Sequence, residues 1–427
     1  MFIKKTKLSP NKEQLIDAFR QHVSSGKAAF FEKYQMQFMT GERAGCWLHD
    51  IDGKQELFNL HCNGGVFNLG HRNPEIIQAL CEGTNFADIG NHHLLSQYRA
   101  NFARTLCNTM PNELNSVVFG VSGGEAVDLA IKLARGHKKR QKIISVDGGY
   151  HGHTGLSVQA GDEKYRKPFH LQTNGFAQVP FNDLQAMDKA LDEETAAVIL
   201  ETIPATLGML MPDEDYLPSI RRWCDERGIL LILDEVQTGW GRTGKLWGFE
   251  HFNIIPDMVI LGKGMSGGIY PMSATIIADK LKAVFEQEPF AHISTFGGSE
   301  LGCLVSQRVL EISSSSKFLK HVNTLADEFN HQLSQLKQAP LIGFKQMGLM
   351  MALETESELA GQILTKTAYD QGLLLIYANN RQSALQFLPP LIMDFESIPD
   401  VIQRLTKALK QANRLIPLVK AKNRLGL

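Results

Sequence analysis

Two short apolar runs, each followed by an ionisable residue, constrain what this chain can fold into. Residues 229–233 run without a polar interruption into Asp234, and residues 258–261 lead through a glycine to Lys263. Continuous apolar runs of this length are typical of strands that are covered on both faces of a parallel sheet. Because such sheets bind ligands at the edge where their strands end, the pattern predicts an α/β fold with Asp234 and Lys263 together at that edge.

Lys263 stands between Gly262 and Gly264, so another molecule can approach its amine closely. A lysine and an acid at one sheet edge suit pyridoxal phosphate (PLP), because the lysine forms the Schiff base and the acid keeps the pyridine nitrogen protonated. In this interpretation Lys263 is the Schiff-base lysine and Asp234 is the partner of the pyridinium. The alternative for these two residues alone is a buried ion pair with a structural role.

The sequence around both residues resembles a known family. DEVQTGWGRTG (234–244), followed by PDMVILGKGMSGG (256–268), is similar to class-III PLP-dependent aminotransferases, which include ornithine, acetylornithine and 4-aminobutyrate aminotransferases. The resemblance runs from about Phe38 to the C-terminal helices. It implies fold type I, an α/β architecture in which a large, mostly parallel-sheet domain carries the cofactor beside a smaller α+β domain.

The resemblance and the length of 427 residues both predict two domains. We expect residues 1–60 to be an N-terminal segment that contributes to the small domain, residues 61–297 to form the large PLP-binding domain, and residues 298–427 to form the C-terminal small domain. Apolar periodicity predicts the outer elements. These are helices over 11–24, 299–313, 317–336, 356–371 and 399–415, and a strand over 347–353.

A glycine pair at a predicted helix start indicates an anion site. Residues 116–121 favour a strand, and Ser122, Gly123 and Gly124 then open a helix, whose free N–H groups and dipole suit a phosphate. The resemblance implies that these three residues form the cup for the cofactor phosphate. Gly124 replaces the hydroxyl residue of the family motif, so one hydrogen bond, worth about 1.5–3 kcal/mol to a charged group, is lost unless water or another donor supplies it.

The resemblance also implies residues that hold the pyridine ring. Tyr150 stacks on one face of the ring, Val236 meets the other face, and Gln237 hydrogen-bonds the phenolic oxygen. His151, in the loop after Tyr150, is counted among the cofactor contacts and not as a metal ligand. Thr295 reaches the cofactor phosphate of a neighbouring subunit, which implies a homodimer with shared active sites.

Two positions bear on the substrate. Glu201 borders the substrate pocket in the resemblance, and Thr202 replaces the proline that follows it in the family, which predicts a different path for the loop 202–212. Gln386 stands where the family commonly has an arginine that grips the substrate α-carboxylate with two hydrogen bonds, which a neutral amide cannot copy. Either Arg381 takes over, or the amino donor lacks that carboxylate, or the reaction is not transamination.

The resemblance therefore implies a PLP-dependent aminotransferase. We expect it to move an amino group of the terminal or ω type from a small-molecule amine to a keto acid or other carbonyl acceptor, with Lys263 carrying the proton. The alternatives are a PLP enzyme of the same fold that does not transaminate (an epimerase or racemase, a mutase or a lyase) and a non-catalytic binding protein. A nicotinamide-dependent dehydrogenase is disfavoured, because no G-x-G-x-x-G motif opens a helix.

Composition narrows the expected partners and the expected location of the protein. Lys and Arg number 44 against 45 Asp and Glu, so no basic stripe for nucleic acid is expected. The six cysteines form no C-x-x-C pair, which disfavours a disulfide framework or a zinc site and favours the cytoplasm. The N-terminus has no apolar core of signal-peptide length, and no apolar run of about 18 residues indicates a membrane span.

Overall fold

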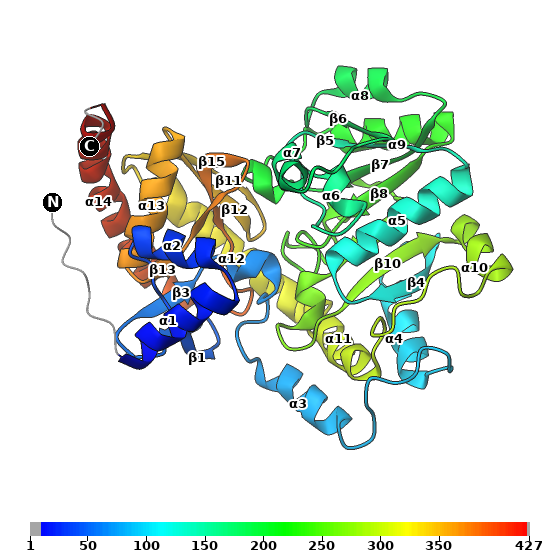
Figure 1. The fold of residues 1–427 in the computed structure, drawn as a ribbon, viewed down its shortest axis with the longest axis horizontal. Coiled ribbons are helices and arrows are strands. Elements are labelled where there is room, and N and C mark those ends of the chain that lie inside the picture. Colours follow the sequence, from blue (N-terminus) through cyan, green and yellow to red (C-terminus); the bar gives the residue numbers. More distant parts are fainter. Residues whose placement is uncertain (1–9, 425–427) are drawn as a thin grey trace.

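The computed structural model describes residues 10–424, so residues 1–9 of the predicted N-terminal segment lie outside the described part. Two lobes lie side by side (Figure 1). The larger lobe is built on a seven-stranded sheet with the order β4-β10-β9-β8-β7-β5-β6. Its strands are β4 (Leu114–Gly120), β5 (Lys142–Val146), β6 (Phe176–Val179), β7 (Thr195–Glu201), β8 (Leu230–Asp234), β9 (Met258–Leu261) and β10 (Ser273–Ala278). All neighbours run parallel except β10, which is antiparallel to β4 and β9.

The central strands are apolar throughout because helices cover both faces of the sheet. Every residue of β7, β8 and β9 is buried. Alternate residues enter separate cores: Leu230 and Ile232 pack with helix α5 (Gly123–Lys138), whereas Leu231 and Leu233 pack with α9 (Tyr216–Arg227). The predicted buried strands and the parallel-sheet architecture are thus confirmed, with α5 lying across the sheet in Figure 1.

The carboxyl ends of the strands are level with one another. Glu201, the last residue of β7, pairs in register with Asp234, the last residue of β8, and Asp234 pairs with Ile260 of β9. Lys263 follows two residues after the end of β9. Three ionisable side chains are therefore delivered to one rim of the sheet, as the sequence pattern predicts.

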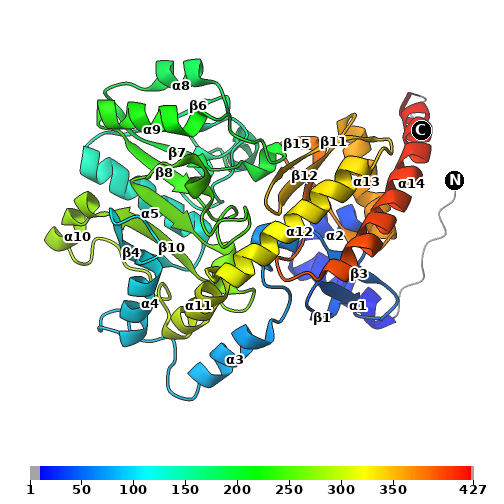
Figure 2. The same ribbon diagram turned by 180° about the vertical axis from the view of Figure 1, so that it is seen from behind.

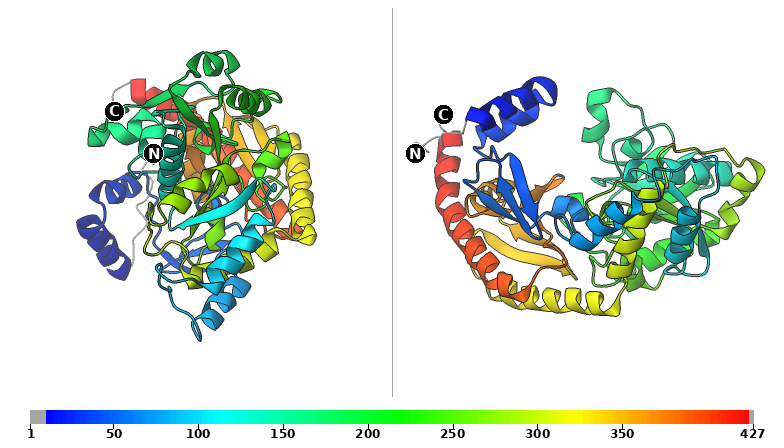
Figure 3. Two further views of the ribbon diagram at one scale, coloured as in Figure 1. Left: turned by 90° about the vertical axis from the view of Figure 1, so that its right-hand side faces the viewer. Right: turned by 90° about the horizontal axis from the view of Figure 1, so that it is seen from below.

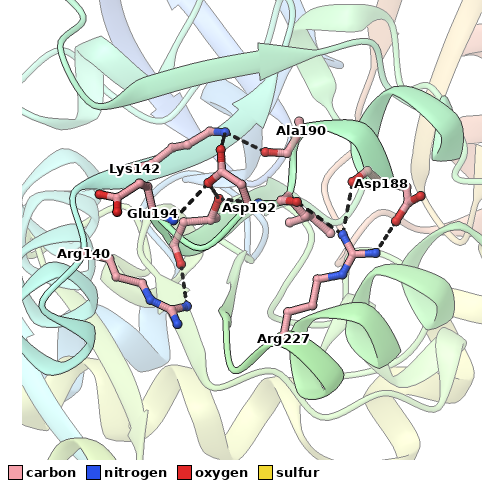
Figure 4. A network of polar contacts seen from close by, with 9 residues as sticks. Arg140, Lys142, Asp188, Ala190, Asp192, Glu194 and Arg227 are labelled. Carbon is pink, nitrogen blue, oxygen red and sulfur yellow. Dashed lines mark hydrogen bonds and ion pairs between the residues drawn. The ribbon is translucent and has the colours of Figure 1, made fainter.

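The opposite rim is held by a polar network, shown in Figure 4. Lys142, at the start of β5, donates to the carbonyl of Ala190 at 2.6 Å and to Asp192 Oδ2 at 2.7 Å. Arg227, at the end of α9, donates to the carbonyl of Asp188 at 3.1 Å and pairs with its carboxylate. These contacts join the start of β5 and the end of α9 to helix α8 (Leu184–Ala190) and the residue Asp192 after it.

The smaller lobe contains two four-stranded sheets, with the orders β1-β2-β3-β13 and β11-β12-β15-β14. The strands are β1 (Thr40–Ala44), β2 (Trp47–Asp50), β3 (Glu56–Asn59), β11 (Leu341–Met347), β12 (Met350–Thr355), β13 (Leu373–Leu374), β14 (Ile376–Ala378) and β15 (Arg381–Phe387). Since β3 pairs with β13, the N- and C-terminal segments build one lobe together. The helices of this lobe are α1 (Pro10–His22), α2 (Ser25–Lys33), α12 (Ser316–Gln335), α13 (Glu358–Asp370) and α14 (Ile398–Arg424).

Helix α12 lies along the back of the molecule between the lobes (Figure 2). It follows α11 (Glu300–Ser313), which packs on α3 (Pro74–Gly83) and α4 (Gln97–Cys107). Seen from below, α12 and α14 border the small lobe on one side, and α1 and α2 project on the other (Figure 3). The predicted boundary at residues 297–298 stays a prediction.

One predicted element is wrong in detail. The single strand predicted over residues 347–353 is two strands, because Gly348 turns the chain at a φ of +57° between β11 and β12. That turn lies against Thr243: a Cβ built at Gly348 would be 2.3 Å from the carbonyl carbon of Thr243. Among residues 10–424, no helix combines the length and the apolar character needed to span a bilayer.

Candidate active site

A cavity of about 330 Å³ opens at the carboxyl ends of β7, β8 and β9. Ten predicted site residues line it: Ser122, Gly123, Gly124, Tyr150, His151, Glu201, Asp234, Val236, Gln237 and Lys263. The lining also includes Gly152, His153, Thr154, Ile203 and Thr238, none of which was among the predicted site residues. Gln386 lies beside this cavity, and Thr295 does not line it.

Lys263 is presented to the cavity by a strained backbone. It has a φ of +42°, a conformation that non-glycine residues rarely adopt and that concentrates at functional sites. Its Nζ donates to Gln237 Oε1 at 2.6 Å. Gly64 makes room for the amine, because a Cβ built there would lie 3.0 Å from Nζ. Burial lowers the pKa of Lys263, against the raising effect of Asp234 and Glu201, which favours a neutral, nucleophilic amine.

Asp234 is oriented from both sides. The Nδ1 of His151 lies 2.9 Å from Asp234 Oδ2, and the backbone N–H of Val236 donates to Oδ1 at 3.1 Å. Although burial alone lowers the pKa of His151, the hydrogen bond and charge of Asp234 raise it overall, so the imidazole is held protonated on Nδ1 toward the carboxylate. His151 therefore acts on Asp234, and no metal ligation is needed to account for it.

The first turn of α5 closes the cavity on the β4 side. Ser122 Oγ accepts the N–H of Glu125 at 3.2 Å and so caps the helix, which leaves its own hydroxyl proton and the N–H groups of Gly123 and Gly124 directed outward. A Cβ built at Gly123 would lie 3.4 Å from Val236. The turn thus forms a backbone cradle for an anion at the positive end of a sixteen-residue helix.

Gly124 is required by a close approach of two chain segments. The backbone at Gly152 has a φ of +121°, and a Cβ built there would lie 2.7 Å from the Cα of Gly124. A Cβ built at Gly124 would in turn lie 2.9 Å from Thr154 Oγ1. The missing hydroxyl of the first turn therefore has a packing cause in the loop after Tyr150.

Glu201 is a buried carboxylate in the cavity wall. Its oxygens accept the backbone N–H of Tyr150 at 2.9 Å and of Ala205 at 3.2 Å. Burial raises the pKa of Glu201 to about 7, helped by the charge of Asp234 and opposed by His151 and both hydrogen bonds. Its protonation therefore changes close to neutral pH.

Gln386 lies beside the cavity and comes from the other lobe. It is a buried residue of β15, and its Oε1 lies 3.4 Å from Nε2 of Gln237, whose Oε1 accepts from Lys263. Arg381, at the start of the same strand, pairs with Glu354 at 2.9 Å and does not line the cavity. Among the described residues that line the cavity, no arginine is present.

The loop after β7 is anchored through the side chain of Thr202. It is buried and donates its hydroxyl to Oε1 of Glu235, whose carboxylate also accepts the backbone N–H groups of Gly248 at 2.6 Å and Phe249 at 3.0 Å. Sequence reasoning missed Glu235. The signal was available, because an acid directly after a strand-end aspartate points to the opposite side of the strand.

Arg242 joins the two lobes. Its buried guanidinium donates to the carbonyls of Leu349 at 3.0 Å and Pro389 at 2.7 Å and to Asn68 Oδ1 at 2.6 Å. All three acceptors lie far from it in sequence, so Arg242 has a structural role and does not line the cavity.

His61 was also missed by sequence reasoning. Burial, together with a smaller effect of the charge of Lys263, lowers its pKa to about 4, so its imidazole is neutral near the amine. No motif in the sequence marks it.

The arrangement defines a class of enzyme before any comparison. A lysine amine, a carboxylate held by histidine, and a glycine cradle at a helix N-terminus converge on one cavity, and this is the donor set that PLP requires. The cavity therefore fits a PLP-dependent enzyme that acts on amines.

Comparisons with known proteins agree with this class of enzyme. The model of the aminotransferase class-III family matches residues 30–409, and the chain belongs to this family. It is 49% identical over 405 residues to an uncharacterized aminotransferase of Archaeoglobus fulgidus, covering 94% of this chain and 95% of that one. It is 32% identical to a putrescine aminotransferase of Pectobacterium atrosepticum, with 95% and 90% covered. The ornithine aminotransferase of Toxoplasma gondii superposes with a TM-score of 0.86 at 26% identity, covering 96% and 97%. The chain is thus an aminotransferase with the fold type I architecture of PLP-dependent enzymes.

Proposed function

We propose that this aminotransferase binds PLP in the cavity and takes its amino group from a primary amine that bears no carboxylate on the reacting carbon, with a diamine as the preferred donor. The donor R–CH2–NH3⁺ leaves as an aldehyde, and a keto acid or other carbonyl acceptor leaves as the corresponding amine, so atoms and charge balance over the two half-reactions. The observation that carries the proposal is a cavity lined by two carboxylates, Glu201 and Asp234, and by no arginine among its described residues.

Each residue of the cavity would have its own role in the reaction. When bound, PLP supplies an aldehyde that captures the amine and a cationic ring that withdraws electrons. Lys263 would hold the aldehyde at rest and would then move the proton from the donor carbon, for which its lowered pKa suits it. Asp234, oriented by His151, would keep the ring nitrogen protonated. Tyr150 and Val236 would enclose the ring, and Gln237 would meet its phenolic oxygen.

The donor preference follows from the charges around Gln386. A donor carboxylate placed there would meet a neutral amide, because Arg381 is paired with Glu354. Moving a carboxylate out of water without a charged partner costs free energy. A donor with hydrogen or alkyl on that carbon carries no such cost.

Glu201 would accept hydrogen bonds from a second ammonium group on the donor. It is the carboxylate in the wall that is not needed by the ring, and its oxygens keep acceptor capacity beyond the two backbone N–H groups. The relative from Pectobacterium atrosepticum, named a putrescine aminotransferase, is in keeping with this choice.

A donor panel tests this proposal. The holoenzyme should be assayed with pyruvate as the common acceptor against a linear diamine, a monoamine of the same length, 4-aminobutyrate, ornithine and glutamate. All donors except glutamate should also be assayed with 2-oxoglutarate, because glutamate and 2-oxoglutarate would only exchange with each other. We expect the diamine to have the highest kcat/KM and glutamate the lowest. A glutamate value above that of both amines would contradict the proposal.

We further propose that the enzyme is a cytoplasmic homodimer. Two segments, 86–95 and 290–296, expose large apolar side chains. These are Phe86, Ile89, Leu94, Leu95, Phe290, Ile293 and Phe296. Arg99 ties the segments together, donating to the carbonyls of Gly298 at 2.9 Å and Asn91 at 2.9 Å. A patch of this kind is typical of an interface, and exposed Thr295 lies within it. Six free cysteines are in keeping with the cytoplasm.

The dimer is tested by light scattering coupled to gel filtration. The wild-type chain should elute as a dimer, and Leu95→Asp should shift it toward the monomer and lower PLP retention, because Thr295 would no longer reach a neighbour's phosphate. Leu418→Asp, which alters another exposed leucine, is the matched control. A monomeric wild-type enzyme with full activity would contradict the proposal.

A further inference from the structure

Thr154 occupies the place that a side-chain hydroxyl of residue 124 would take. Its Oγ1 lies 2.9 Å from the position of a Cβ built at Gly124, so the two sites share the same space. Thr154 lines the cavity with Ser122, Gly123 and Gly124, at the first turn of α5. It is itself an exposed residue in the wall of the cavity.

The loop that carries Thr154 is anchored to the same helix. Asp128, one turn after Gly124 in α5, accepts the backbone N–H groups of Leu156 at 2.9 Å and Ser157 at 2.7 Å. Ser157 Oγ accepts the backbone N–H of Thr154 at 3.1 Å and lies 3.1 Å from Thr154 Oγ1. The hydroxyl of Thr154 is therefore set at a defined position relative to the helix N-terminus.

The proton of that hydroxyl is available to an anion. Ser157 Oγ can direct its own proton to the carbonyl of Thr154, 3.2 Å away. Thr154 then needs only to turn its O–H from Ser157 toward the cradle to donate to a bound oxyanion. Gly152 permits this arrangement, since any side chain there would strike the Cα of Gly124.

We propose that Thr154 donates the hydrogen bond to the cofactor phosphate that Gly124 cannot make, with Asp128 and Ser157 as positioning residues. In this site the hydroxyl comes from the loop and not from the helix start. Gly124 has no side chain, and Thr154 places its hydroxyl in the space that a side chain of residue 124 would need. The proposal rests on the binding of PLP proposed above.

The test measures affinity and not turnover. Apoenzyme is titrated with PLP and, separately, with pyridoxal, which lacks the phosphate, and binding is followed by absorbance. Thr154→Val should weaken PLP by about 10- to 100-fold and leave pyridoxal unchanged, because the lost bond goes to a charged group. Inorganic phosphate should also compete less well against PLP on this variant. Thr154→Ser, which keeps the hydroxyl, should retain most of the affinity for PLP.

A double variant tests this placement of the hydroxyl. Gly124→Ser combined with Thr154→Ala returns a hydroxyl to the helix start and removes the two γ atoms of Thr154 that a Cβ at residue 124 would meet, so this double variant should recover much of the PLP affinity that Thr154→Ala alone loses. Equal PLP affinity of Thr154→Val and wild type, an equal loss for pyridoxal, or a double variant no better than Thr154→Ala would each overturn the proposal. If wild-type apoenzyme itself binds no PLP, the proposed cofactor is wrong, and that result is distinct from a failure at Thr154. Melting curves of each apoenzyme show whether a variant is folded.

Discussion

The two halves of the cavity are built in different ways. The half assigned to the cofactor comes from one lobe, and its side chains stand at strand ends and at a helix start: Asp234, Lys263, and the first turn of α5. The half assigned to the substrate combines Glu201, the last residue of β7, with Gln386, which β15 of the other lobe brings beside the cavity. The first half has the residues that the family resemblance implies, except for Gly124. The second half has a neutral glutamine in place of the expected arginine.

The difference teaches how one fold can keep its chemistry and change its substrate. Groups at the edge of a sheet are held by register and by packing on both faces, so they tolerate little change. Groups that reach the cavity across an interface between lobes can change charge without disturbing the strands. The following changes to the chain test this division, from the largest effect expected to the smallest.

Lys263→Ala should have the largest effect, because no other lysine lines the cavity among the described residues. Without an amine to hold the cofactor and move the proton, kcat should fall by at least about 10³-fold. The absorbance of the lysine-bound cofactor should disappear as well. Lys410→Ala, on the exposed face of α14, is the control and should behave as wild type. Residual turnover within tenfold of wild type would show that Lys263 is not the catalytic lysine.

Asp234 and His151 should rank below Lys263 and differ from each other. Asp234→Asn removes the charge that we propose faces the ring nitrogen and should lower kcat by roughly 10²- to 10³-fold. His151→Gln removes one charged hydrogen bond to Asp234 and should lower kcat only about 10- to 100-fold. If both variants lose the same factor and the double variant loses no more, the pair acts as a unit, and the assignment of His151 as a supporting residue is wrong.

Gln386→Arg should sharpen the contrast between the two halves by changing only the substrate half. An arginine can fork onto a donor carboxylate, so kcat/KM for glutamate should rise by about 10- to 100-fold while that for the diamine falls. The affinity for PLP should not change. Arg381→Gln, which alters the arginine paired with Glu354, is the matched control and should leave the glutamate value as it is.

The smallest effect expected is a pH dependence of donor choice. Since the pKa of Glu201 is raised to about 7, its carboxylate is charged above neutral pH and protonated below it. The ratio of kcat/KM for the diamine to that for the monoamine should therefore fall by up to about tenfold between about pH 8 and pH 6. Taking the ratio removes the titration of Lys263, which both donors share. Glu201→Gln should flatten the profile, and an unchanged slope in this variant would exclude Glu201 as the group responsible.

The sheet edge was predictable because it depends on local pattern. Apolar runs covered on both faces, and the ionisable residues that end them, follow from the chain itself, so Asp234 and Lys263 could be placed together without coordinates. Contacts made across the fold could not be read this way. The packing of Gly152 on Gly124, the hydroxyl of Thr154 in the cradle, and the pairing of Arg381 with Glu354 depend on distances between segments far apart in the chain. His61, beside Lys263, carries no sequence signal at all.

The measurement that tests the account most directly is a single-turnover half-reaction without acceptor. Holoenzyme is mixed with excess diamine or excess glutamate, and the absorbance of the lysine-bound cofactor is followed in a stopped-flow instrument. The account predicts rapid loss of that absorbance and growth of the aminated cofactor with the diamine, and a much slower change with glutamate. Equal or faster conversion with glutamate would contradict it, because a cavity with no arginine among its described lining residues would then have bound the donor carboxylate.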